Sequence, residues 1–105
     1  MKKCIVHPRF VTAEFFNPNN TQAERNRAFA AGFDIEQVLR DDPYAFIIET
    51  GDPALVAEHF KQGDNVILYG AYLGGCLKTA FEALQAIGAK PEYHSTGCIP
   101  FFEGK

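Results

Sequence analysis

The chain has 105 residues, 47% of them hydrophobic and 22% charged, which fits a single globular domain over residues 1–105. A net charge of −3 argues against nucleic acid as a partner, because phosphate binding needs clustered lysine and arginine. No apolar run reaches the roughly 18–20 residues that span a bilayer, and the first apolar stretch is too short for a signal peptide. We therefore expect a cytoplasmic protein with no membrane contact, whose three cysteines are reduced.

The first half of the chain alternates extended and helical patterns. Residues 2–7, KKCIVH, are expected to form a short buried strand that ends before Pro8. The stretch VTAEFF at residues 11–16 fits either a second extended piece or a helical turn. Capping signals in TQAE and DIEQ predict helices over residues 21–31 and 34–40.

The second half repeats strand and helix with clear boundaries. Asp52 and Pro53 are typical of a helix start, and Gly63 and Gly88 are typical of helix ends. Strands are expected at residues 44–49, 65–70 and 90–97, and helices at residues 52–63 and 76–88.

Strands that alternate with single helices and show little polar alternation indicate a parallel sheet covered on both faces. We predict an α/β fold, a three-layer αβα sandwich with about four strands in the order 2-1-3-4. In such sheets ligands bind beyond the carboxyl ends of the strands, at the switch point between the first and third.

This edge collects the reactive side chains of the chain. The first strand ends at His7, the second at Glu49, and the third leads through AYLGG to Cys76. The fourth ends near residues 94–98, which hold His94, Thr96 and Cys98. The remaining cysteine, Cys4, lies inside the first strand and is expected to be a core residue.

Cys76 is the best chemical candidate. At the start of a helix it lies in a partial positive field that favours thiolate. Gly74 and Gly75 remove side chains beside it, so a substrate can approach backbone amides that stabilise an oxyanion. Tyr72, His94 and Thr96 are the further candidates for binding a small molecule. The alternative is that Cys76 is a small apolar residue beneath a glycine turn.

Residues 65–98 resemble the isochorismatase-like (cysteine hydrolase) family. The shared frame is a strand ending in glycine, a loop, a cysteine at a helix start, an alanine-rich helix and a closing glycine, here Gly70, Cys76, Thr79-Ala80, Ala83-Leu84 and Gly88. The resemblance implies that Cys76 is the nucleophile, and that a cis peptide and an oxyanion-binding turn lie within residues 71–76. It also implies hydrolysis of an amide or enol ether.

Two features depart from that family. The family has an aspartate as general base at the end of its first strand, where this chain has His7. The family's catalytic lysine has no lysine counterpart here, and Arg40 offers only a loose alignment.

Three hypotheses follow. The first is a cofactor-free hydrolase of a small amide, ester or enol ether, with Cys76 as nucleophile and His7 as its base. Asp52, Glu49 and Asp41 are all candidates to orient His7, and the sequence selects none of them.

The second hypothesis is a non-catalytic module that binds a small ligand or a protein partner. The Phe15-Phe16 and Phe101-Phe102 pairs support it as possible homodimer contacts. The third is a zinc site built from His7, Cys76, His94 and Cys98, although the chain lacks a metal-binding motif. A redox pair of Cys76 with Cys98 is a variant of it.

Overall fold

The computed structural model describes residues 1–7, 35–49 and 52–99. The elements of this part of the chain are β1 (Lys2–Val6), α2 (Ile35–Asp41), β2 (Phe46–Ile48), α3 (Pro53–His59), β3 (Asn65–Ala71), α4 (Cys76–Ala86) and β4 (Lys90–Ile99). The segments expected at residues 11–16 and 21–31 lie outside the described residues, as do both phenylalanine pairs.

The sheet has the predicted topology. Its four strands are ordered β2-β1-β3-β4, and every neighbouring pair is parallel. β1 is central, with Cys4 opposite Phe46 of β2 on one side and Leu68 of β3 on the other. All four strands therefore end at the same edge of the sheet, just past Val6 of β1.

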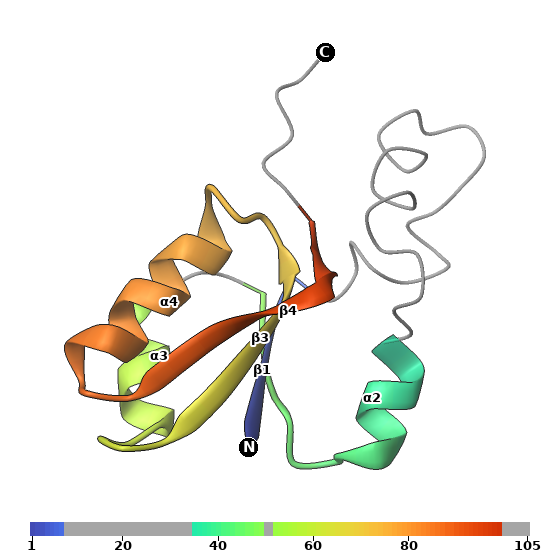
Figure 1. The fold of residues 1–105 in the computed structure, drawn as a ribbon, viewed down its shortest axis with the longest axis horizontal. Helices are drawn as coiled ribbons and strands as arrows, with labels where there is room; N and C mark the ends of the chain where they lie inside the picture. The colour runs from blue at the N-terminus through green and yellow to red at the C-terminus, as the bar shows by residue number, and fades with distance from the viewer. Residues whose placement is uncertain (8–34, 50–51, 100–105) are drawn as a thin grey trace.

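Helices cover both faces of the sheet (Figure 1), which confirms the three-layer αβα sandwich. Successive residues of a strand point to opposite faces, so Cys4 and Val6 join one core and Ile5 the other. The larger core is closed by α3 and α4, and the smaller core packs against Val38 and Leu39 of α2.

Helix α3 begins as predicted but ends earlier. Asp52 caps it, since its Oδ1 accepts a hydrogen bond from the amide of Ala54 at 2.9 Å, and Pro53 is its first residue. The helix ends at His59 instead of Gly63, because Phe60 adopts an extended conformation and buries its ring in the larger core. Gly63 lies in the turn that follows the helix and has a φ of +87°.

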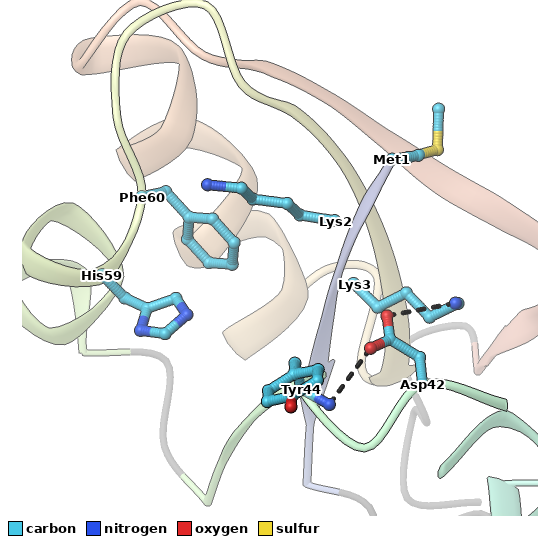
Figure 2. Close-up of a pocket in the computed structure, with 7 residues that line it drawn as sticks. All are labelled: Met1, Lys2, Lys3, Asp42, Tyr44, His59 and Phe60. Atoms are coloured by element: carbon cyan, nitrogen blue, oxygen red, sulfur yellow. Dashed lines mark hydrogen bonds and ion pairs between the residues drawn. The ribbon is translucent and has the colours of Figure 1, made fainter. Parts of the chain in front are cut away.

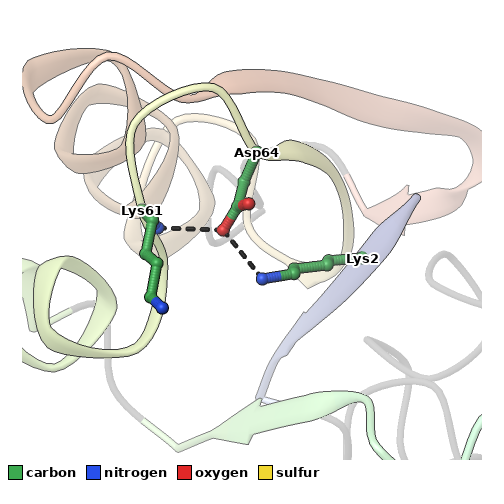
Figure 3. Close-up of polar contacts among 3 residues, drawn as sticks. All are labelled: Lys2, Lys61 and Asp64. Atoms are coloured by element: carbon green, nitrogen blue, oxygen red, sulfur yellow. Dashed lines mark hydrogen bonds and ion pairs between the residues drawn. The ribbon is translucent and has the colours of Figure 1, made fainter.

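The turn between α3 and β3 is tied to the start of β1. The Asp64 carboxylate accepts hydrogen bonds from the amide of Lys61 at 2.9 Å and from Nζ of Lys2 at 3.0 Å (Figure 3). These two donors hold the pKa of Asp64 below its ordinary value.

Strand β4 is longer than predicted and is irregular in its middle. It advances from Tyr93 to Cys98 while β3 advances only from Leu68 to Gly70, so the residues between bulge out of register. Beyond the bulge, pairing resumes and extends to Ile99.

None of the helices described here has the length and apolar character needed to cross a bilayer.

Candidate active site

The site is a contact between a histidine and a cysteine at the carboxyl edge of the sheet. Nε2 of His7 lies 3.2 Å from Sγ of Cys76, a hydrogen-bond distance for this pair of atoms. His7 follows β1, and Cys76 is the first residue of α4. Both side chains are partly buried, and the imidazole is 18% exposed. The fold thus brings together two residues that are 69 positions apart in the chain.

The backbone of His7 turns sharply to make this contact. Its φ of +51° lies in the left-handed region, which residues with a side chain seldom adopt, although histidine is among those enriched there. Its amide donates a 2.8 Å hydrogen bond to the carbonyl of Ile48, so the ladder between β1 and β2 holds the turn in place. An unfavourable backbone conformation fixed by its surroundings is typical of a functional position.

Gly70 supports the site from the neighbouring strand. It pairs with Val6, the residue before His7, and has φ +115°. A Cβ atom at this position would overlap the carbonyl oxygen of Val6. Glycine is therefore required for β3 to approach β1 where the loop to Cys76 begins.

The loop before Cys76 is held by backbone hydrogen bonds to Tyr72. The peptide bond between Ala71 and Tyr72 is cis, within the segment for which the family resemblance implies one. The carbonyl of Tyr72 accepts hydrogen bonds from the amides of Gly75 at 2.9 Å and Leu77 at 3.2 Å, so these two amides are occupied. The amide of Cys76 has no backbone acceptor among the described residues, as is usual for the first residue of a helix.

A carboxylate lies on the other side of the imidazole. Oε2 of Glu49 is 3.8 Å from Nδ1 of His7, and the Glu49 side chain is 61% exposed. The other two carboxylates considered from the sequence are engaged elsewhere. Asp52 caps α3, and Asp41 accepts a hydrogen bond from Nε2 of Gln37 at 2.8 Å.

The other two cysteines differ from Cys76 in burial. Cys4 and Cys98 are both buried, and burial raises the pKa of Cys4 to about 12 and of Cys98 to about 11. The Cys98 thiol also donates a 3.1 Å hydrogen bond to the carbonyl of Leu68. All three cysteines are free, so Cys76 and Cys98 do not form a disulfide.

His94 contacts Gly97 and Tyr69. Its Nδ1 accepts a 2.9 Å hydrogen bond from the amide of Gly97, and its ring stacks on Tyr69 at 4.7 Å. Tyr69 belongs to the core beneath α2, whereas Cys76 packs against the core beneath α3 and α4.

The four donors considered for zinc are not assembled. Within residues 1–7, 35–49 and 52–99, no three His, Cys, Asp or Glu side chains gather as a metal site. Thr96 lies in the irregular part of β4, but its side chain is outside the described ones.

A separate pocket of about 330 Å³ lies at the opposite, amino edge of the sheet (Figure 2). It is lined by Met1, Lys2, Lys3, Asp42, Tyr44, His59 and Phe60. Its two lysines are paired with carboxylates, Lys2 with Asp64 and Lys3 with Asp42. It offers no cysteine, whereas the Cys76–His7 contact joins a thiol to an imidazole, so that contact is the better candidate for chemistry.

Comparison with known proteins gives no match, whether with protein families, curated proteins or solved structures. Function is therefore inferred from the geometry of the site.

Proposed function

We propose that this protein is a cysteine-dependent hydrolase of small amides or esters, in which Cys76 is the nucleophile and His7 the general base. The observation that carries the proposal is the 3.2 Å distance between Nε2 of His7 and Sγ of Cys76. A thiol within hydrogen-bond reach of an imidazole, at the start of a helix, is the arrangement that activates cysteine for attack on a carbonyl.

The first half of the reaction is acyl transfer to the protein. Nε2 of His7 takes the thiol proton, and Sγ of Cys76 attacks the carbonyl carbon of the substrate. A C–S bond forms, and the electron pair of the C=O π bond moves to oxygen, where the amide of Cys76 donates a hydrogen bond. When the carbonyl re-forms, the bond to the leaving group breaks. His7 gives its proton to the departing amine or alcohol, which leaves a thioester.

The second half is hydrolysis of that thioester. His7, neutral again, takes a proton from water as the oxygen attacks the acyl carbon. The C–S bond then breaks, the carboxylic acid leaves, and the proton on His7 returns to the thiolate. One water is consumed for each bond cleaved, and the protein ends in its starting state.

Features around the pair support this proposal over a packing role for Cys76. Cys76 is the half-buried member of the three cysteines, and Gly74 beside it is exposed, so a small substrate has access. We favour amides and esters over enol ethers because a thiol forms an acyl intermediate only with a carbonyl. The strand–loop–cysteine–helix order agrees with the proposed relation to isochorismatase-like hydrolases, and a reactive thiol suits the reducing cytoplasm.

The test is to trap the acyl intermediate. The protein is incubated with an activated ester such as p-nitrophenyl acetate, and mass spectrometry locates the adduct. We expect a burst of p-nitrophenol and a single acetyl group on Cys76, both lost in Cys76→Ser. Absence of both the burst and an acetyl adduct on Cys76 would contradict the proposal and favour a non-catalytic binding module.

A further inference from the structure

The imidazole of His7 lies between two ionisable groups from different elements. The end of β2 positions the first of these groups, Glu49. The Ile48 carbonyl accepts a 2.8 Å hydrogen bond from the His7 amide, and Glu49 is the next residue. This places Oε2 of Glu49 3.8 Å from Nδ1, while Nε2 faces Cys76 at 3.2 Å. The ring therefore presents one nitrogen to a thiol and the other to a carboxylate.

We propose that Glu49 is a positioning residue that stabilises the protonated form of His7. The inference rests on the proposed function, in which His7 takes the Cys76 proton and becomes a cation. A carboxylate on the far nitrogen attracts that cation and has no ion pair with the neutral ring. Glu49 thus favours the thiolate–imidazolium state over the thiol–imidazole state.

The described elements place two ionisable groups in contact with the ring. Helix α4 contributes the Cys76 thiol, and the end of β2 contributes Glu49. On the other side of β1, β3 presents Gly70, and β4 behind it presents the buried neutral thiol of Cys98.

The same carboxylate limits the substrate class. Glu49 is 61% exposed, and its oxygen lies one imidazole ring away from the thiol. A carboxylate at this position repels an approaching anion, and the repulsion weakens as salt rises. The site should therefore accept uncharged or cationic acyl compounds in preference to anionic ones.

The test measures the rate of alkylation of Cys76 as a function of pH in the 105-residue chain, with mass spectrometry assigning the site. The proteins are the wild type, Glu49→Gln, His7→Asn and Glu58→Gln. The last is a matched control, because Glu58 is an exposed glutamate in α3. With iodoacetamide at pH 6 we expect Glu49→Gln to slow alkylation about three- to tenfold and to move the midpoint of the profile to higher pH, while Glu58→Gln changes neither.

A second readout uses charge. At pH 9, Glu49→Gln should raise the rate with iodoacetate about twofold relative to iodoacetamide. Equal thermal unfolding midpoints for wild type and Glu49→Gln establish that both are folded.

The outcomes separate the two proposals. If His7→Asn slows alkylation but Glu49→Gln follows the wild-type profile and ratio, the role of Glu49 is overturned and the Cys76–His7 pair stands. If the wild type is alkylated with the pH dependence of an ordinary thiol, and neither His7→Asn nor Glu49→Gln changes that dependence, both proposals fail.

Discussion

Gly70 packs so closely against Val6 that a side chain at position 70 would overlap the Val6 carbonyl oxygen. We expect Gly70→Ala to lower the free energy of unfolding by about 3 kcal/mol or more, since the added methyl group meets backbone and the φ of +115° disfavours alanine. Urea denaturation measures the loss, and alkylation of Cys76 should slow together with it.

Gly63 provides the matched control for that substitution. It also has a positive φ, +87°, but a Cβ atom there would meet nothing within 4 Å. Gly63→Ala should therefore show only the conformational cost, about 1 kcal/mol. Equal losses at the two positions would mean that the close approach of β3 to β1 is not what Gly70 provides.

The three cysteines should react very unequally in the folded protein. Burial raises the pKa of Cys4 to about 12 and of Cys98 to about 11, so both stay protonated at neutral pH. We predict that brief iodoacetamide treatment at pH 7 modifies Cys76 alone, and that denatured protein is modified at all three positions. Mass spectrometry of peptides checks this, and native labelling of Cys98 at a rate similar to that of Cys76 would contradict it.

Two substitutions of His7 should separate its chemistry from its backbone conformation. His7→Asn and His7→Ala both remove the base, so both should lose the alkylation of Cys76 below pH 7. Asparagine tolerates the left-handed region and alanine does not, so His7→Ala should be less stable by about 1 kcal/mol. Denaturant unfolding of the two variants measures this difference, and equal stability would show that the φ of +51° carries no such cost.

Asp64 should make stability depend on pH in the acid range. The Lys61 amide and the Lys2 amine lower its pKa in the folded state from 3.8, so its contribution is fully present above about pH 4 and disappears as pH falls through the lower folded value. Asp64→Asn should therefore be less stable than wild type at pH 7, and the two curves should converge in strong acid.

Lys2→Met is the control for the Asp64 prediction. It removes the amine at 3.0 Å but leaves the Lys61 amide, the stronger of the two influences on the carboxylate. Its loss of stability at pH 7 should be smaller than that of Asp64→Asn. If the free energy of unfolding of both variants differs from that of the wild type by the same amount at every pH, this linkage is contradicted.

The sheet order was predictable from the sequence because the first three strands contain short apolar runs and helices with capping signals separate the strands. Right-handed crossovers then place the first strand beside the third, and so the end of β1 beside the start of α4. That reasoning sufficed to put His7 near Cys76. The choice of Glu49 over Asp52 and Asp41 needed coordinates, because all three carboxylates follow or flank β2 and only local hydrogen bonds distinguish them.

The region around His94 shows where sequence patterns stop being informative. A strand ending near residue 97 would place His94 at the same edge as Cys76. In the structure β4 loses register between Tyr93 and Cys98, and the His94 ring stacks on Tyr69. Bulges depend on pairing with a distant strand, so no local propensity identifies them. The early end of α3 has a similar cause, because the burial of Phe60 is a tertiary effect.

The central place of β1 has a consequence for how the protein is made. β1 is translated before β2 and β3, yet it forms its ladders only with those two strands. β1 can pair with β2 first, but its second ladder is not available until β3 has left the ribosome, and until Cys76 follows β3 His7 has no cysteine to meet. The nascent chain therefore carries an apolar segment whose two partner strands are made later, and the Cys76 thiol emerges only after β1, β2 and β3.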